Sequence, residues 1–377
     1  MNYDIVVTCA FGTESVLKKE LRKMSFFDAK AIDGSINLSG DEKAVAKLNM
    51  FLHTAERVYI KVATFPSESF DELFDAVYSL PWENYLTKSS RVIVNGKSVK
   101  SRLFSLSDCQ KIIKKAIFKR LAFATKTSYF PENGAETEIV FSIRNDLCTL
   151  LINTSGKGLH KRGYRDFVGA APMKETLACA LLLLSGFSAE RPFIDPFCGS
   201  GTLVTEGARM ALGIAPGRDR DFAYRPWDTF DKSVYDLSLE EARDNENLRK
   251  LDFAGYDIDP DAIKLSLRHA EKAGVRNYVH FQVRDVKELS SSLKNGVIVT
   301  NPPYGERLLT PREANLLYRT FGDAVKNLPD WEINVITSAP QFEKAFGKKS
   351  DANRKFFNAD KECHYYMYNR FDNPPKK

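Results

Sequence analysis

The segment Val297–Leu309, with the sequence VIVTNPPYGERLL, leads an apolar run into an asparagine, two prolines and a tyrosine. Pro302 and Pro303 each hold the residue before them in an extended conformation. Because the prolines also remove two backbone donors, the corner presents acceptors, namely the Asn301 side-chain oxygen and the Pro302 carbonyl. Acceptors without donors suit an amino group, and Tyr304 adds a ring face on which a planar base can stack. Taken alone, the corner is also consistent with a rigid turn that has no chemical role.

A glycine-containing turn is predicted by the segment DPFCGSGT, Asp195–Thr202, between an apolar strand and a helix. Gly199 and Gly201 allow a tight turn and let a ligand approach the backbone at the helix N-terminus. The turn is not the dinucleotide fingerprint GxGxxG, which needs a glycine where this chain has Val204. The P-loop pattern also fails, and a purely structural turn is the alternative.

Three aspartates follow the next two strands. Asp257 and Asp259 lie in GYDIDPDA, and Asp285 lies in QVRDVKEL. Asp259 is predicted to cap a helix that begins at Pro260. Asp257, at the tip of its strand, is the better candidate to hold the hydroxyls of a ribose. Asp285 can accept a hydrogen bond from an exocyclic amine or cap a helix, and its sequence favours neither role.

These residues need a scaffold that brings strand ends together. Beyond Ala170, predicted helices alternate with short, continuously apolar strands, which is typical of a mostly parallel sheet covered on both faces. In such sheets ligands bind at the carboxyl ends of the strands, where the residues above lie. The predicted strands are 192–195, 253–259, 278–285, 296–304, 333–339 and 364–371.

The first 155 residues predict a different, α+β organisation. Residues 1–50 predict a strand, a helix, a strand and a helix. Residues 51–154 begin with a strand and a helix whose N-cap is Ser69. A second strand, a basic helix over about 107–123 and two more strands follow.

Basic residues are concentrated in one part of this N-terminal half. From Leu86 to Lys126 there are eleven Lys and Arg and a single acid, in a chain whose formal net charge is +6. The rest of the chain is therefore net negative. A local basic patch on an otherwise acidic protein predicts a polyanion partner, although any single lysine can equally belong to a solvated helix face. The residues predicted to contact the polyanion are Lys97, Lys100 and Arg102, with Lys114 and Lys115 behind them.

Changes of pattern along the chain predict its domains. We expect an N-terminal unit over 1–50, a second unit over 51–155, a linker over 156–170 and a catalytic unit over 171–377. Glycines in the linker predict flexibility and its charges predict solubility. The stretch of sequence between the glycine turn and Asp257 is too long for a compact βαβ unit, so an insertion must lie at about 214–250. The insertion either covers the site or contacts RNA, and its sequence does not decide which.

Length and composition exclude several classes of protein. The 377 residues, 43% of them apolar, predict two or three domains with sizeable cores. We expect no N-terminal signal sequence, because the first ten residues read as a strand, and no stretch approaches the roughly 18 apolar residues of a membrane span. The six cysteines form no CxxC pair and the five histidines have no ligand spacing. We therefore expect no disulfide framework, no metal and a cytoplasmic location.

Together, the motifs DPFCGSGT, GYDID, VRD and TNPPYGERL resemble those of the class I methyltransferases that use S-adenosylmethionine and methylate exocyclic amines. Residues 51–121 resemble a THUMP RNA-binding domain with its usual ferredoxin-like partner before it. HKRGYR, APMKETLA and GIAPGRDR resemble segments of the bacterial THUMP-containing rRNA guanine-N2 methyltransferases. The resemblance implies an α/β, Rossmann-like catalytic domain with a seven-stranded, mostly parallel sheet, preceded by an α+β ferredoxin-like plus THUMP region. Those similar methyltransferases also carry an insertion after the glycine turn.

The resemblance also implies roles for individual residues. Asp257 matches the acid that holds the cofactor ribose, and Asp285 matches the residue that binds the adenine amine. Asn301, Pro302, Pro303 and Tyr304 match the target-amine motif, and Asn301 also lies beside the cofactor. The residues that match the loop around the methionine part of the cofactor are Asp195, Phe197, Gly199, Gly201 and Thr202.

The implied function is S-adenosylmethionine-dependent methylation of a guanine N2 amine in RNA, with large-subunit (23S) rRNA as the expected substrate. The alternatives are N2-guanine methylation of tRNA, and a non-catalytic RNA-binding ribosome-assembly factor that keeps the fold. The corner motif would also serve adenine N6 in DNA or a glutamine amide in a protein, and the basic half argues for RNA. The expected partner is RNA, with no membrane and no metal.

Overall fold

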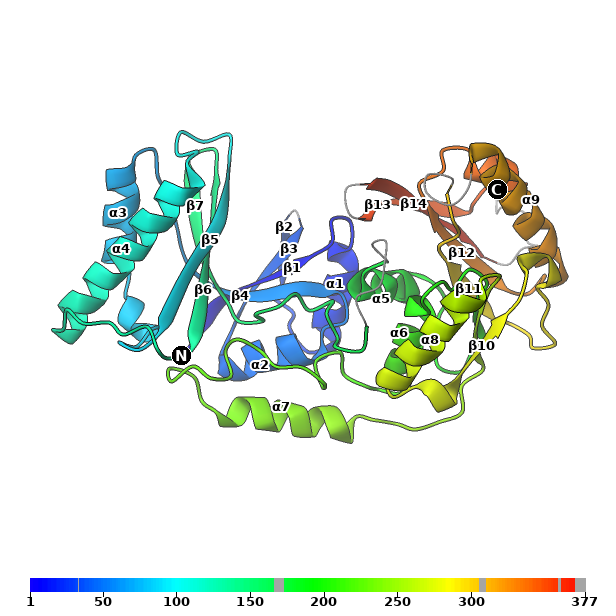
Figure 1. Cartoon of the computed structure of the whole chain (residues 1–377), viewed down its shortest axis with the longest axis horizontal. Helices are drawn as coiled ribbons and strands as arrows, with labels where there is room; N and C mark the ends of the chain where they lie inside the picture. Colours follow the sequence, from blue (N-terminus) through cyan, green and yellow to red (C-terminus); the bar gives the residue numbers. More distant parts are fainter. Residues whose placement is uncertain (33, 166–172, 305–309, 359–360, 370–377) are drawn as a thin grey trace.

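The computed structural model describes residues 1–32, 34–165, 173–304, 310–358 and 361–369. The described chain is elongated and contains two seven-stranded sheets, one in each half of the sequence (Figure 1). The first sheet and its helices occupy the left and centre of the view, and the second sheet occupies the right.

The first sheet runs without a break through both predicted N-terminal units. Its strands are β1 (Tyr3–Cys9), β2 (Lys30–Ile32), β3 (Ser35–Gly40), β4 (Ala55–Pro66), β5 (Arg91–Val99), β6 (Glu136–Arg144) and β7 (Leu147–Asn153). They lie in the order β2-β3-β1-β4-β7-β6-β5. The long strand β4 pairs antiparallel with β1 on one side and with β7 on the other. The two units therefore share β4, and the boundary predicted near residue 50 stays a prediction.

Four helices cover one face of this sheet. Alternate strand residues such as Ile5 and Phe141 are fully buried in the same core as helix residues such as Leu17. The predicted helix cap at Ser69 is confirmed, because its hydroxyl accepts a hydrogen bond from the Glu72 N–H at 3.2 Å. The helices are α1 (Glu14–Lys23), α2 (Glu42–Phe51), α3 (Phe70–Ser79) and α4 (Leu106–Thr125), with the short helix η1 (Trp82–Asn84).

The second sheet has the predicted mostly parallel form. Its strands are β8 (Phe193–Asp195), β9 (Phe253–Asp257), β10 (Val279–Val283), β11 (Val297–Thr300), β12 (Glu332–Thr337), β13 (Ala352–Asn358) and β14 (Lys361–Tyr368). In the order β10-β9-β8-β11-β12-β14-β13, the first five strands are parallel, β14 pairs antiparallel with β12, and β13 pairs antiparallel with β14. Strand β13 was not predicted from the sequence, because ANRKFFN lacks the continuous apolar run that marks the other strands.

Helices cover both faces of the second sheet, as the apolar strands predicted. Val297 and Val299 of β11 are buried in one core and Ile298 in the other. The first core includes residues of α5 (Glu175–Leu184), α6 (Thr202–Ala211) and α8 (Pro260–Lys272). The second includes residues of α9 (Pro311–Ala324) and α10 (Phe342–Phe346). The remaining short helices are η2 (Arg276–Tyr278), η3 (Val286–Glu288) and η4 (Val325–Asn327).

The insertion joins the two halves of the molecule. Its helix α7 (Ser233–Asp244) packs against α2 and runs below the centre of the molecule in Figure 1. Phe222, Trp227 and Tyr235 are buried in the core of the N-terminal half. The indole N–H of Trp227 donates to the backbone oxygen of Glu136 at 3.1 Å. The sequence left the role of this insertion open, and the structure shows that its apolar side chains attach the catalytic half to the N-terminal half.

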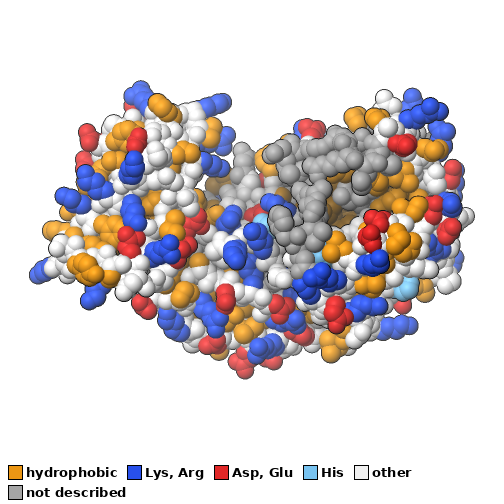
Figure 2. Space-filling view, in the orientation of Figure 1, with side chains coloured by type: hydrophobic (Ala, Val, Ile, Leu, Met, Phe, Trp, Pro, Cys, Tyr) orange, Lys and Arg blue, Asp and Glu red, His pale blue; other side chains and the backbone are white. Residues whose placement is uncertain are grey.

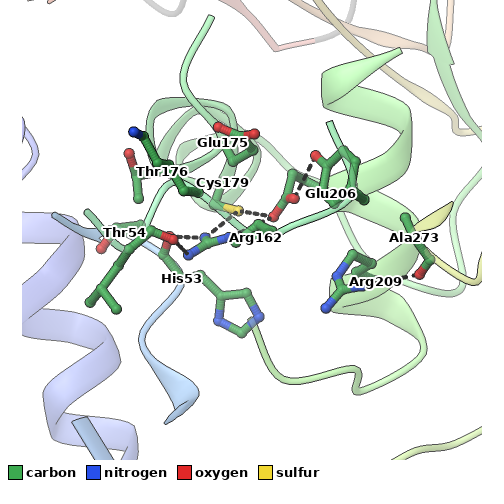
Figure 3. Close-up of polar contacts among 12 residues, drawn as sticks. His53, Thr54, Arg162, Glu175, Thr176, Cys179, Glu206, Arg209 and Ala273 are labelled. Carbon is green, nitrogen blue, oxygen red and sulfur yellow. Dashed lines mark hydrogen bonds and ion pairs between the residues drawn. The ribbon is translucent and has the colours of Figure 1, made fainter. Parts of the chain in front are cut away.

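The charges of the predicted linker were expected to serve solubility, but at least one of them is buried. The Arg162 side chain is 1% exposed, and its Nε lies 3.6 Å from a carboxylate oxygen of the equally buried Glu206 (Figure 3). The Arg162 guanidinium also donates to the backbone oxygen of His53 in the N-terminal half at 2.7 Å. Glu206 accepts further hydrogen bonds from the Tyr164 hydroxyl at 2.7 Å and the Cys179 thiol at 3.1 Å. This part of the segment is therefore a packed joint and not a solvated tether.

A second polar contact between the halves centres on Glu56, at the start of β4. Its carboxylate accepts hydrogen bonds from His160 Nδ1 at 3.3 Å, Lys174 Nζ at 3.2 Å and the Thr176 hydroxyl. Burial alone would raise the pKa of Glu56, but these three partners outweigh it and lower the pKa to about 2. Residues 166–170, the remainder of the predicted linker, lie outside the described residues.

We expect Trp227→Ala to lower the free energy of unfolding of the full chain by roughly 3–5 kcal/mol, the usual cost of truncating a buried aromatic side chain. Urea unfolding at pH 7 measures this loss. The matched control is Asp228→Ala, which changes the next residue, whose side chain is 68% exposed, and should shift the value by less than about 0.5 kcal/mol. Equal small effects of both substitutions would show that the insertion does not hold the halves together.

We expect Glu56→Gln to destabilise the chain in a pH-dependent way. Because the folded-state pKa of Glu56 lies below its unfolded value of 4.5, its stabilisation is complete above that value and is lost as the pH falls towards 2. The difference in unfolding free energy between wild type and variant should be largest near pH 6, at roughly 3 kcal/mol. Urea titrations from pH 6.5 to pH 3.5 should show this difference shrinking, and a difference independent of pH would contradict the assignment.

Candidate active site

The strand order of the second sheet reverses at β8. This strand pairs with β9 on one side and with β11 on the other, and ligands of open α/β sheets bind at the carboxyl ends of the strands at such a point. Every predicted catalytic and cofactor residue lies at or just after the end of β8, β9, β10 or β11. The fold therefore brings them to one edge of the sheet. Residues 305–309, at the end of the corner motif, lie outside the described residues.

Asp195 links the two strands at the reversal. It ends β8, is 2% exposed, and its Oδ1 accepts hydrogen bonds from the Thr300 hydroxyl at 2.6 Å and the Phe197 N–H at 3.2 Å. Thr300 ends β11, so this contact fixes the two strand ends against each other. Burial raises the pKa of Asp195 to about 7, although the two hydrogen bonds act in the opposite direction. The ring of Phe197 packs edge-on against Phe321 of α9, with centroids 5.3 Å apart.

The turn after β8 has the backbone that its glycines predicted. Gly199 and Gly201 have φ values of +51° and +76°, a region that favours glycine. The Gly199 N–H donates to Asp257 Oδ2 at 2.9 Å, so the turn is tied to the end of β9. Thr202 begins α6, and no described side chain caps this helix start. Its first N–H groups thus have no capping side chain among the described residues, and such groups are suited to donate to a ligand.

The three aspartates lie at neighbouring strand ends. Asp257 ends β9 and accepts a second hydrogen bond from the Asp259 N–H at 3.0 Å. Asp259 caps α8 ahead of Pro260, as predicted. Asp285 caps η3 by accepting from the Lys287 N–H at 3.0 Å, and this backbone hydrogen bond lowers the pKa of Asp285. Capping is thus one role of Asp285, and its contact with an adenine amine stays a prediction.

The corner after β11 is held from outside as well as by its prolines. Within residues 301–304, Pro302 is buried and the other three are partly buried. The hydroxyl of Tyr318, a fully buried residue of α9, donates to the Pro303 backbone oxygen at 3.0 Å and lies 3.4 Å from the Thr337 hydroxyl at the end of β12. The corner therefore has a fixed position relative to both α9 and β12.

Three residues of this edge were missed in the sequence. Thr300 could have been noticed as a polar residue ending an apolar strand. Tyr318 has the spacing of an ordinary core residue, so no signal marked it. Ile258 lies between Asp257 and Asp259 and is 69% exposed. An apolar residue between two strand-end acids is a usable signal, because it offers a surface to a planar ring beside a carboxylate.

The residues predicted to bind RNA lie in the other half of the molecule. Lys97 is on β5, and Lys100 and Arg102 follow it in the loop before α4; all three are exposed. The Arg102 guanidinium pairs with Glu68. Phe104, in the same loop, is 83% exposed, so an aromatic ring stands among these cations. In Figure 2 the left-hand lobe carries many Lys and Arg side chains, several along its edge towards the notch between the two halves.

The two lysines on α4 have partners within the N-terminal half. Lys114 Nζ lies 2.8 Å from a carboxylate oxygen of Glu132. Lys115 Nζ lies over the ring of Phe74, 5.8 Å from its centroid. These contacts make both lysines weaker candidates for RNA than the exposed Lys97 and Lys100.

Within the described ranges, no group of three or more His, Cys, Asp or Glu side chains is arranged to hold a metal ion. None of the helices in the described part of the chain is both long and apolar enough to cross a membrane.

Three family models match the chain. The RlmL ferredoxin-like domain matches residues 4–59 and the THUMP domain matches residues 67–153. The model UPF0020, described as an RMKL-like methyltransferase domain, matches residues 162–367. The predicted combination of domains is therefore confirmed, while the predicted boundaries at 50, 155 and 170 stay predictions.

Similar proteins with curated names include YpsC of Bacillus subtilis (strain 168), which carries an RNA methyltransferase name. It is 38% identical over 97% of this chain and 96% of its own length. The ribosomal RNA large subunit methyltransferase K/L of Buchnera aphidicola subsp. Acyrthosiphon pisum (strain APS) is 32% identical over 94% of this chain. The chain spans about half the length of that relative, 52%.

Two solved structures share the whole architecture. SMU.472, described as a methyltransferase complexed with SAH, superimposes with a TM-score of 0.95 at 36% identity, over 99% of both chains. A protein of Listeria monocytogenes str. 4b F2365, named for N6-adenine-specific DNA methylase activity, gives a TM-score of 0.93 at 40% identity, over 98% of this chain and 96% of its own. The methyltransferase model alone spans more than half of the sequence, and the chain belongs to the RMKL-like methyltransferase family.

Proposed function

We propose that the chain methylates the N2 amine of a guanine in RNA, and that large-subunit rRNA is its substrate. The observation that carries the proposal is the acceptor corner at the end of β11, in a chain whose other half is a basic THUMP region. The names of the K/L relative and of YpsC support rRNA and RNA, respectively.

The cofactor of this reaction is S-adenosylmethionine. This prediction is confirmed by the SAH complex of the similar SMU.472, because SAH is what remains after the methyl group has been transferred. The described edge fits the cofactor, since the uncapped start of α6 offers N–H donors and Asp257 offers a carboxylate. In our proposal Asp257 holds the ribose hydroxyls, Asp285 accepts from the adenine amine, and the exposed Ile258 packs on the adenine ring. The glycine turn, with Asp195, Phe197 and Thr202, surrounds the methionine part.

The corner acts by orienting the amine. The N2 amine of guanine is a poor nucleophile because its lone pair is delocalised into the ring. The Asn301 side-chain oxygen and the Pro302 carbonyl accept hydrogen bonds from its two N–H groups, which favours a more pyramidal nitrogen and aims the lone pair at the methyl group. The hydrogen bond from Tyr318 to Pro303 keeps the corner in place. Tyr304 stacks on the base, which has been flipped out of its helix because a paired base does not fit the site.

Methyl transfer then needs no general base within the corner. When bound, S-adenosylmethionine supplies an electrophilic methyl group on its sulfonium. The nitrogen–carbon bond forms as the sulfur–carbon bond breaks, and the surplus proton of the amine leaves to water. Asn301 and Pro302 contribute geometry and not proton transfer, so the rate should depend on their position more than on pH.

The N-terminal half binds the RNA at positions distant from the base that reacts. Lys97, Lys100 and Arg102 contact phosphates, and Lys114 and Lys115 add to the field behind them. The exposed Phe104 offers a stacking surface among these cations. Shape and phosphate contacts thus select a structured RNA, and the corner selects the amine within it.

The second candidate function is methylation of adenine N6. The name of the Listeria structure favours it, and an acceptor corner fits any planar exocyclic amine. The basic THUMP region favours the guanine proposal, because an enzyme that methylates DNA would not need an RNA-binding domain.

Product analysis separates the two candidates. The full chain is incubated with labelled S-adenosylmethionine and unmodified large-subunit rRNA, and the digested nucleosides are identified by mass spectrometry. Label in N2-methylguanosine supports the proposal. Label in N6-methyladenosine would keep the chemistry of the corner and overturn the base. If rRNA remained unlabelled and tRNA, tested in the same way, became labelled, the proposal that rRNA is the substrate would be wrong.

We expect Asn301→Ala to lower turnover by at least roughly 100-fold, because the amine loses an orienting acceptor. Its affinity for S-adenosylhomocysteine, measured by calorimetry, should stay within about threefold of wild type. Tyr318→Phe, which removes the hydrogen bond to Pro303 and leaves Asn301 in place, should cost less, roughly 10-fold. An Asn301→Ala enzyme with normal turnover would remove this residue from the mechanism.

We expect RNA affinity to fall steeply with salt, and Lys97→Ala and Lys100→Ala each to reduce the slope of log K against log salt by about 0.7–0.9. Fluorescence anisotropy with an rRNA fragment between 50 and 300 mM KCl measures the slope. Lys114→Ala is the matched control, since Glu132 already pairs with this lysine, and should change the slope less. A wild-type affinity that does not depend on salt would refute the phosphate contacts.

A further inference from the structure

Arg165, the last residue of the segment HKRGYR, lies beside the glycine turn at the cofactor edge. Arg165 is 14% exposed, and its NH1 donates to the Met173 backbone oxygen at 2.8 Å and lies 3.2 Å from a carboxylate oxygen of Glu175. Its NH2 lies 3.5 Å from the hydroxyl of Ser200, in the middle of the glycine turn. One edge of the guanidinium is thus anchored in the protein, and the other faces the turn.

The glycine turn has two distinguishable ends. At Gly199 the backbone N–H is bonded to Asp257, the proposed ribose-binding acid. Beyond it, the Ser200 and Thr202 hydroxyls lie 3.4 Å apart at the start of α6, on the side that Arg165 approaches. With the ribose at Asp257, the amino-acid end of the cofactor lies toward Ser200, Thr202 and Arg165. This orientation rests on the proposed function.

The amino-acid end of S-adenosylmethionine carries a carboxylate, which needs a partner when it leaves water. The donors on this side are the uncapped start of α6 and the Arg165 guanidinium. Arginine binds carboxylates through two parallel N–H groups, a geometry that lysine does not offer. We propose that Arg165 binds the carboxylate of the methionine part of the cofactor.

The position of Arg165 also depends on the N-terminal half. Arg162, three residues earlier, is fixed by the backbone oxygen of His53 and by Glu206 of α6 (Figure 3). Tyr164, the residue before Arg165, also bonds to Glu206. The same short segment therefore touches the N-terminal half, the helix that begins at the glycine turn, and the turn itself. Cofactor binding through Arg165 is in this way tied to the docked arrangement of the two halves.

The test compares two ligands that differ by one carboxylate. Calorimetry measures the affinity of the full chain for S-adenosylhomocysteine and for its decarboxylated analogue, which keeps the amine. Arg165→Ala should lower the affinity for S-adenosylhomocysteine roughly 10–100-fold, the range expected for a lost charged hydrogen bond. The affinity for the analogue should stay within about threefold of wild type, which also shows that the variant is folded. Arg165→Lys should recover part of the loss.

Lys174→Ala is the matched control, because it removes a nearby cation that bonds to Glu56 instead of the turn. Both of its affinities should stay within about threefold of wild type. If Arg165→Ala weakens both ligands equally, or neither, the carboxylate contact is wrong while cofactor binding stands. If the wild-type chain binds neither ligand, the proposed function and this inference fall together.

Discussion

The buried ion pair between Arg162 and Glu206 is the contact on which the arrangement of the molecule depends. Both side chains are 1% exposed, so each charge has lost its water. Burial alone would lower the pKa of Arg162 and raise that of Glu206, yet their attraction shifts both pKa values in the opposite directions. The attraction within an ion pair offsets the desolvation free energy of the two charges when their other hydrogen-bonding groups also have partners. One of the groups that satisfies Arg162 is the His53 carbonyl, which belongs to the other half of the chain.

The two halves therefore stabilise each other as one body. The guanidinium of Arg220, in the insertion, donates to four backbone oxygens within residues 155–161. The segment that leaves the first sheet is thus held by the insertion, while Trp227 holds the insertion in the N-terminal core. Glu206 lies on α6, the helix that begins at the glycine turn. A change in how the halves dock would consequently shift the residues at the edge where the cofactor residues meet.

The sequence predicted what local patterns encode. Apolar runs located six of the seven strands of the second sheet, and the strand-end motifs placed Asp195, Asp257 and Asn301 on one edge. Patterns along the chain do not encode partners that lie far away in sequence. The charges of residues 156–165 therefore predicted solubility, although Arg162 pairs with Glu206. The same limit hid the docking of the insertion and the hydrogen bond from Tyr318, whose spacing is that of a core residue.

The way the halves meet bears on the choice of substrate. Phe357 of β13 pairs with Glu362, past the position where β14 reaches the carboxyl end of β12. Its ring lies edge-on to Phe11 of the N-terminal half, with centroids 5.8 Å apart, and Arg354 donates to the Ser15 hydroxyl nearby at 3.2 Å. The N-terminal half thus docks on the ligand-binding side of the catalytic sheet. In our proposal a large structured RNA contacts both the basic region and the corner, whereas a small free amine would use the corner alone.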